Sequence, residues 1–172
     1  MKLKTLLLST AVALLTAITA NAADNLFAAQ PAVNFWTPPY SKYQPSYNET
    51  GELKVDLNKA KGKNMAVLKL TPDSELVPGK RYALSMSAKS ESRVAVILSL
   101  PEAKGDGSVD GKGKLKPMTT WNNLNPKWKM IEAKFTFDPE LSDGTFPLLV
   151  IEKQLQKGGS FTVKNFKLVA ID

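Results

Sequence analysis

The dominant pattern along the chain is an alternation of apolar and polar residues, which begins at residue 52 and continues to the C-terminus. In the segment 81–89, for example, every second side chain is large and apolar or an alanine, and most residues between are polar. No window of helical length shows an apolar stripe with a 3.6-residue period. The sequence therefore predicts an all-β protein. Its expected strands are residues 52–57, 64–71, 81–89, 93–100, 128–138, 146–153 and 161–171.

Two of these segments carry further information on how the strands are arranged. Residues 93–100 are apolar on both faces, which predicts a central strand. In residues 161–171 the apolar positions change from odd to even numbers, and a β-bulge near Lys164 and Asn165 reconciles the two phases. The turn-rich segment between the first two strands favours a hairpin. Seven or eight strands separated by turns, in a chain of this length, predict an antiparallel two-sheet β-sandwich.

The first 22 residues have the three parts of a secretory signal peptide. A basic start with two lysines precedes an apolar run over residues 5–20, and an A-x-A cleavage site ends at Ala22. The apolar run is shorter than the ~20 residues that span a bilayer, and no later segment approaches that length. We therefore expect cleavage after Ala22, one β-sandwich domain over residues 23–172, no transmembrane segment, and a secreted or periplasmic location.

The chain contains no cysteine and no histidine. Disulfides, thiolate metal sites and nucleophilic thiols are therefore excluded, and so are a Ser-His-Asp arrangement and imidazole-bound metals. A glycosidase could still work with two carboxylates. Most acidic residues lie in turns or alternate with core positions, where solvated carboxylates are the rule, so we do not expect an enzyme. The candidates for such a pair are Glu102, Asp106, Asp110, Glu132, Glu140, Asp143 and Glu152.

The charge of the chain indicates little about its partner. The signal peptide holds two of the 23 basic residues and none of the 16 acidic ones, which leaves the remaining chain with a net charge of +5. The lysines are scattered between apolar strand positions, a pattern typical of a solvated sheet face. The other interpretation is a weakly anionic partner, such as an acidic glycan or an anionic cell surface. No basic run is interleaved with stacking aromatics, so no nucleic acid is expected as a partner.

Residues 101–117 form a glycine-rich segment with too few apolar side chains to join a core, and we interpret them as a long exposed loop. Within it, Asp106, Ser108 and Asp110 place oxygen atoms at alternate positions, as calcium loops do. Pro117 stands where an EF-hand loop has its final glutamate. A plain flexible turn and a weak calcium site are therefore the two interpretations, and no other cofactor is expected.

The segment 35–50 is the most aromatic part of the chain, although three prolines mark it as a loop. It holds five of the 14 Phe, Trp and Tyr residues and three of the four tyrosines. Prolines stiffen a loop, so its rings can stack on the C–H faces of a sugar at a low entropic cost. The alternative is that the loop caps one end of the sandwich, and we assign Phe35 and Trp36 to the core. The predicted ligand contacts of this loop are Tyr40, Tyr43, Gln44 and Tyr47, and we expect the three tyrosines to be exposed.

Two further tryptophans raise the same choice between packing and binding. Trp121 lies among Thr and Asn residues, and a polar loop around one ring is what a sugar subsite needs. We predict that Trp121 and Asn123 contact a ligand. Trp128 opens a strand with a well-defined apolar face, and we expect it to be a packing residue.

Three segments, ELVPGKRYALSMSAKS, WKMIEAKFTFDPE and GGSFTVKNFKLVAI, follow one another in an order that resembles the jelly-roll carbohydrate-binding modules of the family 4/9 type. The resemblance covers roughly residues 25–172 and rests on hydrophobic and turn positions. It implies a galactose-binding-like jelly roll that binds a glycan, often with a structural calcium ion. Where the family commonly has paired aspartates in the last strand, this chain has Lys164 and Asn165.

Together, the signal peptide, the strand order, the missing histidine and the aromatic loops predict a non-catalytic protein that recognises a glycan or polysaccharide through loop aromatics. One alternative is a structural or adhesive protein that contacts a cell-envelope protein with the same surface. A second is a small glycoside hydrolase. The surroundings of the rings distinguish them: convergent polar groups favour a sugar, a broad apolar patch favours a protein, and two facing carboxylates favour a hydrolase.

Overall fold

A computed structural model describes residues 24–36, 43–59, 65–101, 115–138, 146–152 and 159–171. These residues form strands and contain no helix. The strands are β1 (Ala32–Trp36), β2 (Ser46–Tyr47), β3 (Leu53–Asp56), β4 (Met65–Thr71), β5 (Arg81–Lys89), β6 (Val94–Pro101), β7 (Leu115–Pro117), β8 (Asn122–Asn123), β9 (Lys129–Thr136), β10 (Phe146–Glu152) and β11 (Ser160–Ile171).

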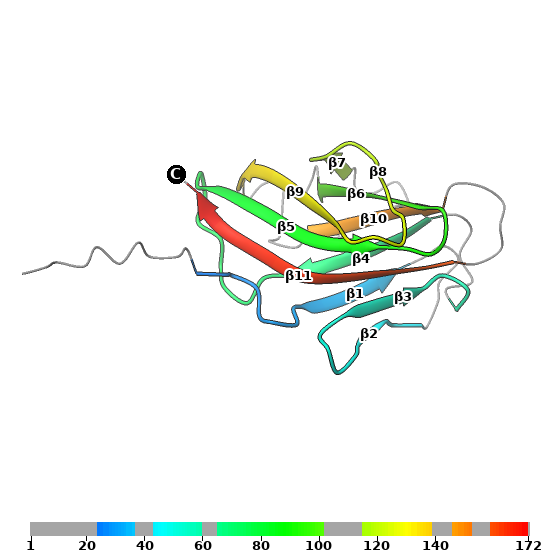
Figure 1. The fold of residues 1–172 in the computed structure, drawn as a ribbon. Helices are drawn as coiled ribbons and strands as arrows, with labels where there is room; N and C mark the ends of the chain where they lie inside the picture. The colour runs from blue at the N-terminus through cyan, green and yellow to red at the C-terminus, as the bar shows by residue number, and fades with distance from the viewer. Residues whose placement is uncertain are drawn as a thin grey trace, which may run out of the picture.

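The strands form two antiparallel sheets that lie face to face (Figure 1). One sheet has six strands in the order β1-β4-β10-β6-β7, with β8 also paired to β6. The other has five strands in the order β2-β3-β11-β5-β9. The prediction of an all-β, antiparallel two-sheet sandwich is therefore confirmed.

The alternation in the sequence becomes the alternation of burial in the sheets. Along β5, Tyr82, Leu84, Met86 and Ala88 are buried in the core, and the residues between them are half-buried or exposed on the outer face of the five-stranded sheet. On β9, Ile131 and its inward neighbours pack into the same core, while every second residue is exposed. Period-two alternation is therefore enough to assign one face of each strand to the core.

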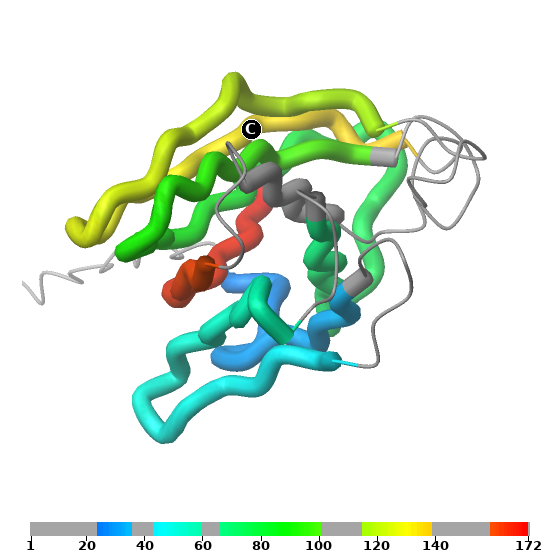
Figure 2. The backbone as a smooth tube through the Cα atoms, turned by 90° about the vertical axis from the view of Figure 1, so that its right-hand side faces the viewer, coloured from blue at the N-terminus to red at the C-terminus, as the bar shows by residue number. Residues whose placement is uncertain are grey.

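Strand β6 is central, as its apolar character on both faces predicts. It pairs with β10 on one side and with β7 and β8 on the other. Val94, Val96 and Leu98 belong to the core between the sheets, while Ala95 and Ile97 are buried on the opposite face of the strand. Figure 2 shows the segment that contains β7 and β8 continuing into β9, so it joins the two sheets at one edge of the sandwich.

The predicted bulge lies in β11. The pairing of β11 with β5 shifts between Lys164 and Lys167, and Asn165 takes a positive φ of 56°. Asn is one of the few residues that tolerates this left-handed conformation at a modest cost. The bulge allows both Val163 and Phe166 to point into the core.

The predicted hairpin between the first two strands is wrong. β3 pairs with β2 and β11 in one sheet, whereas β4 pairs with β1 and β10 in the other. Both strands place apolar residues into the same core from opposite sides, and a sequence pattern cannot distinguish this crossing from a hairpin.

The described part of the chain tests only some of the remaining expectations. Phe35 is buried in the core as expected, and Trp36 ends β1. The predicted signal peptide and most of the 101–117 loop lie outside the described residues, although the end of that loop forms β7. Among the described residues, no helix is long and apolar enough to cross a membrane.

Candidate functional site

Gln44, one of the predicted ligand contacts, uses its amide on the backbone of the protein. Its Oε1 accepts a hydrogen bond from Phe35 N at 2.9 Å, and its Nε2 donates one to Phe35 O at 3.0 Å. The side chain therefore pairs with β1 as a neighbouring strand would, and it covers part of an otherwise open sheet edge.

Tyr43 is half-buried, whereas we expected it to be exposed. Its ring meets Phe35 edge to face, with 5.6 Å between ring centroids. Its hydroxyl accepts a hydrogen bond from Asp56 N at 3.0 Å and donates one to Lys54 O at 3.2 Å. Burial is the main cause that raises the pKa of Tyr43. The side chain thus ties the loop to β3 and the core.

Tyr47 is used in the same way. It is half-buried, its hydroxyl donates to Pro31 O at 2.9 Å, and its ring meets Phe166 edge to face at 6.3 Å between centroids. Burial raises the pKa of Tyr47. The expected exposure of Tyr43 and Tyr47 is therefore wrong, because both rings pack against the core; their contact with a ligand stays a prediction. Tyr40 lies outside the described residues.

Trp121 and Asn123 are exposed, and their contact with a ligand stays a prediction. Trp121 is 40% exposed and lies between β7 and β8 at the edge of the six-stranded sheet. Nearby, Thr119 Oγ1 accepts a hydrogen bond from Leu98 N at 3.1 Å, which anchors the loop to β6. This edge lies far from β2, which borders the other sheet and follows Tyr43 and Gln44 in the chain (Figures 1 and 2). The predicted contacts that are described therefore form two separate groups.

The structure also exposes a tryptophan that we expected to be a packing residue. Trp128 is 36% exposed and directly precedes β9, on the outer face of the five-stranded sheet. Lys89 Nζ lies 4.6 Å and Lys164 Nζ 4.1 Å from the centroid of its ring. Such distances are typical of cation–π contacts. Because Lys89 is on β5 and Lys164 is on β11, the ring reaches across neighbouring strands of the sheet.

The sheet register surrounds Trp128 with polar side chains. Thr162 of β11 pairs with Lys89 of β5, and in the next outward-facing row Lys164 pairs with Ser87. The hydroxyls of Thr162, Ser87 and Ser85 make no hydrogen bond with the described part of the chain. Met130, opposite Ser87 on β9, is 70% exposed. We call this surface, made by Trp128, Lys89, Lys164, Ser85, Ser87 and Thr162, the Trp128 face.

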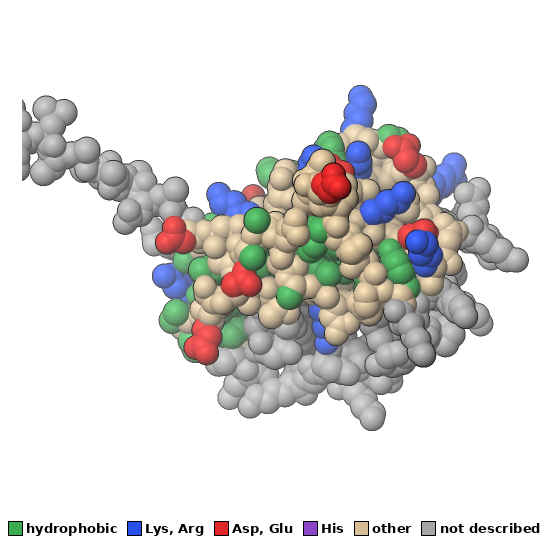
Figure 3. All heavy atoms as spheres, turned by 90° about the horizontal axis from the view of Figure 1, so that it is seen from below, with side chains coloured by type: hydrophobic (Ala, Val, Ile, Leu, Met, Phe, Trp, Pro, Cys, Tyr) green, Lys and Arg blue, Asp and Glu red, His purple; other side chains and the backbone are tan. Residues whose placement is uncertain are grey.

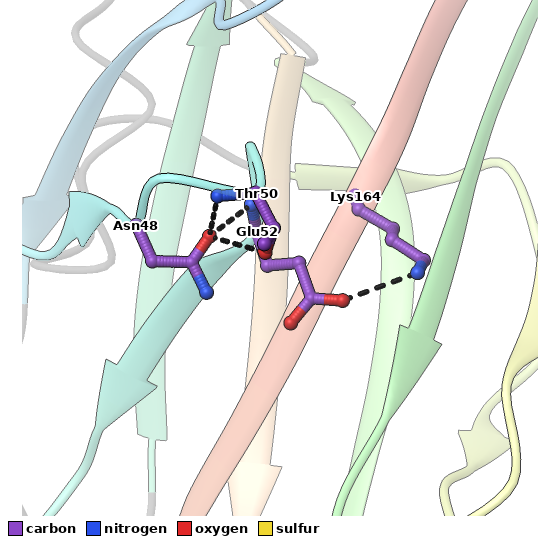
Figure 4. A network of polar contacts seen from close by, with 4 residues as sticks. All are labelled: Asn48, Thr50, Glu52 and Lys164. Carbon is purple, nitrogen blue, oxygen red and sulfur yellow. Dashed lines mark hydrogen bonds and ion pairs between the residues drawn. The ribbon is translucent and has the colours of Figure 1, made fainter.

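One ion pair borders the Trp128 face (Figure 4). Glu52 Oε1 lies 3.1 Å from Lys164 Nζ, and both side chains are half-buried. Asn48 Oδ1 accepts hydrogen bonds from Thr50 N, Thr50 Oγ1 and Glu52 N, which fixes the turn that carries Glu52. The hydrogen bond from Lys164 is the main cause that lowers the pKa of Glu52. The ion pair therefore holds Lys164 between a carboxylate and the indole.

Most of the residues considered for a catalytic or metal centre lie outside the described residues. No group of three or more acidic residues in the described ranges could hold a metal ion. The proposed calcium ligands Asp106, Ser108 and Asp110 lie outside those ranges, so the calcium site stays a prediction.

Glu132, one of the carboxylates considered for hydrolysis, is exposed, and its Oε1 lies 3.8 Å from Lys134 Nζ. Figure 3 shows basic and acidic side chains interspersed on the described surface seen from below.

Comparison with known families identifies the sandwich. A profile of the family CBM_4_9, described as a carbohydrate binding domain, matches residues 32–156. The chain belongs to this carbohydrate-binding family. The matched range extends from β1 to the segment after β10 and includes the whole of β5, β6 and β9. The resemblance noted in the sequence is therefore confirmed.

Solved structures agree at the level of the fold. The N-terminal cellulose-binding domain from Cellulomonas fimi β-1,4-glucanase C has a TM-score of 0.52 and 11% identity, over 82% of this chain and 90% of that one. The structure named "CBM4 structure and function" has a TM-score of 0.51 and 12% identity, over 81% and 94%. "BiXyn10A CBM1 APO" has a TM-score of 0.54 and 16% identity, over 85% and 94%. No curated protein matches the chain.

Proposed function

We propose that this protein binds a glycan without catalysing a reaction on it, and that the Trp128 face is its binding surface. The observation that supports this proposal is an exposed indole on a sheet face whose neighbouring hydroxyls make no hydrogen bond with the described residues. A sugar presents C–H groups on its ring faces and hydroxyls at its edge, so it needs both an aromatic surface and polar groups. Membership of a carbohydrate-binding family supports the same ligand class.

The Trp128 face is well suited to hold these groups in place. Ser85 and Ser87 lie on β5, which is hydrogen-bonded on both sides by β9 and β11. Side chains on a central strand are positioned more accurately than those on a loop, so little order has to be gained on binding. The serines are short, which leaves room above β5 for a ligand beside Trp128.

Trp121 is a second candidate for the aromatic contact, because it is also exposed and stands in a loop rich in Thr and Asn. It lies on the other sheet, at the β6 edge. Contact with Trp121 and Asn123 is one prediction from the sequence, beside contact with Tyr40, Tyr43, Gln44 and Tyr47 of the segment 35–50, and a comparison of the two tryptophans decides between their surfaces.

We also propose that the protein is exported, to the outside of the cell or to a periplasm. The support is the pattern of residues 1–22, with a basic start, an apolar run and an A-x-A site. N-terminal sequencing of the protein from its native host tests this: a mature chain that begins at Ala23 is expected, and an intact N-terminus contradicts export by this route.

The binding proposal is tested with a glycan array and with pull-down on insoluble polysaccharides. We expect Trp128→Ala to weaken binding by about tenfold or more, the effect of removing a central aromatic contact. Trp121→Ala is the matched variant, since it removes an equally exposed indole elsewhere. Both variants must keep the wild-type melting temperature within a few degrees, which is expected for exposed positions.

Three outcomes argue against the proposal in different ways. Loss of binding in Trp121→Ala alone moves the site to the 118–125 loop. Release of new reducing ends from the bound polysaccharide favours a hydrolase. Failure of the folded wild type to bind any glycan contradicts the function itself and favours a cell-envelope protein as the partner, with Trp128 and the exposed Met130 as its apolar contacts.

A further inference from the structure

Positive charge is concentrated at the end of the five-stranded sheet where Trp128 lies. Lys54, Lys89 and Lys164 each follow a buried residue in their strands, so all three side chains point outward from the same face. The register places Lys54 opposite Thr162 and Thr162 opposite Lys89, and Trp128 stands beside Lys89. A row of two ammonium groups, one hydroxyl and one indole therefore crosses the sheet.

Only part of this charge is compensated within the protein. Glu52 pairs with Lys164 at 3.1 Å. Lys89 makes no ion pair with the described residues: its ammonium group lies 4.6 Å from the centroid of the Trp128 ring and interacts with Glu52 only at longer range. An aromatic face attracts a cation but does not neutralise it, so the charge of Lys89 remains available to an anion.

We infer that the ligand of the Trp128 face is an acidic glycan, one whose sugar carries a carboxylate or a sulfate ester. This inference rests on the proposed function and specifies its ligand class. A sugar ring at Trp128 places its substituents beside Lys89 and Lys164, and the hydroxyls of Ser87 and Thr162 can donate further hydrogen bonds to an oxyanion. Lysine binds as a point charge with three rotatable donors, which suits either anion.

Three lysines, Lys54, Lys89 and Lys164, share this end of the sheet with two carboxylates, Glu52 and Asp56, and this excess of positive charge favours an anionic over a neutral ligand. A neutral polysaccharide gains no electrostatic attraction from these lysines, and it must displace their hydration to reach the indole. An oxyanion replaces that hydration with charge-assisted hydrogen bonds, which are roughly twice as strong as neutral ones. Glu52 repels the anion and so weakens its attraction to Lys164.

The inference is tested with polymers that differ only in charge. Binding of the mature chain to polygalacturonate is compared with binding to its methyl-esterified form, and dextran sulfate with dextran, at low and physiological salt. We expect the charged member of at least one pair to bind more tightly, and the salt dependence to follow the charged member only. The pair with the larger difference identifies whether carboxylate or sulfate is recognised.

Substitutions separate a specific site from a general effect of net charge. We expect Lys89→Gln to weaken binding of the charged polymer by about two- to fivefold, the effect of one exposed charge pair, and to leave the neutral polymer unaffected. Glu52→Gln should strengthen binding of the charged polymer by a similar factor. Lys116→Gln, on β7 of the other sheet, changes the net charge as Lys89→Gln does and should leave binding unchanged.

Two outcomes overturn the inference alone. A third also contradicts the proposed function on which the inference rests. Equal effects of Lys89→Gln and Lys116→Gln mean that only net charge attracts the polymer. Binding of neutral polymers at least as tight as of charged ones contradicts an acidic ligand but leaves the proposed function standing. Absence of binding to these polymers and to every glycan of the array contradicts both.

Discussion

At the scale of single residues, Tyr47 shows how an aromatic ring of the proline-rich loop is used for packing. Its hydroxyl donates to Pro31 O at 2.9 Å, and burial raises the pKa of the phenol above its usual value. A group whose pKa is raised in the folded protein contributes stability below the pKa of the unfolded chain, about 10, and this stability is lost as the pH rises. We therefore expect the free energy of unfolding to decrease above about pH 10, with at most about 1.4 kcal/mol per pH unit arising from Tyr47. Urea unfolding between pH 8 and 11.5 measures this slope.

Tyr47→Phe isolates the contribution of the hydroxyl. The variant should lose about 1 kcal/mol at neutral pH, because Pro31 O loses its donor, and its stability should fall less steeply above pH 10. Lysines deprotonate in the same range in both proteins, so their effect cancels in the difference. Parallel pH curves for the two proteins contradict the assignment.

The same scale shows what the sequence could and could not predict about the site. Side chains alternate between the two faces of a strand, so Trp128 faces the same side as Met130, two residues later, which is exposed. Ile131 faces the opposite side and is buried. This alternation can be seen in the sequence, and it predicts the observed exposure of Trp128. For Tyr43 and Gln44 no such signal exists. Their polar atoms bond to backbone groups of β1 and β3, and these partners become neighbours only after the chain has folded.

At the scale of elements, β11 depends on the N-terminal segment. β3 pairs with the part of β11 that precedes the bulge. After the bulge, Leu26 N donates a hydrogen bond to Leu168 O, so the N-terminal segment lies beside β11 in place of β3. Asn25 fixes the junction: its Nδ2 donates to Phe166 O at 3.0 Å, and its Oδ1 accepts from Leu168 N at 2.8 Å. We expect Asn25→Ala to lower the free energy of unfolding by about 1–3 kcal/mol, because these backbone groups lose their partners. Chemical denaturation of both proteins measures the difference.

Asn123→Ala is the matched control for this prediction. Asn123 is exposed on the short edge strand β8, and its replacement should change stability by no more than about 0.5 kcal/mol. A loss in Asn25→Ala no larger than in this control means that water replaces the amide at the bulge.

Local signals in the sequence predicted the strand β11 and its bulge, but not the contact with Asn25 that stabilises the bulge. The change of apolar phase at Lys164 and Asn165 marks the bulge, because an extra residue is the only way to keep both halves facing one core. The contact with Asn25 joins residues more than 140 positions apart, and no periodicity encodes it. The same limit explains the hairpin error, since β3 and β4 have similar patterns although they belong to different sheets.

At the scale of the whole molecule, the excess of positive charge makes each well-placed carboxylate important for stability in acid. The chain carries a formal net charge of +7, and protonation of its carboxylates raises this charge as the pH falls. Glu52 connects the turn before β3 to β11 across the sheet through Lys164. The hydrogen bond from Lys164, and then the charges of Lys164 and Lys89, lower the pKa of Glu52. Its contribution is therefore present above the pKa of an unfolded glutamate, about 4.3, and is lost as the pH falls through the lower pKa of the folded state.

We expect Glu52→Gln to be less stable than the wild type by a constant amount above about pH 5, and this difference to shrink steadily below about pH 4. Glu132→Gln removes one negative charge from an exposed strand of the same sheet and controls for the change in net charge. Melting curves between pH 2.5 and 7 for the three proteins measure both differences. A gap between wild type and Glu52→Gln that stays constant down to pH 2.5 contradicts a lowered pKa. A gap that closes only for Glu52 shows that the ion pair beside Trp128 couples the charge of the Trp128 face to the stability of the whole sandwich.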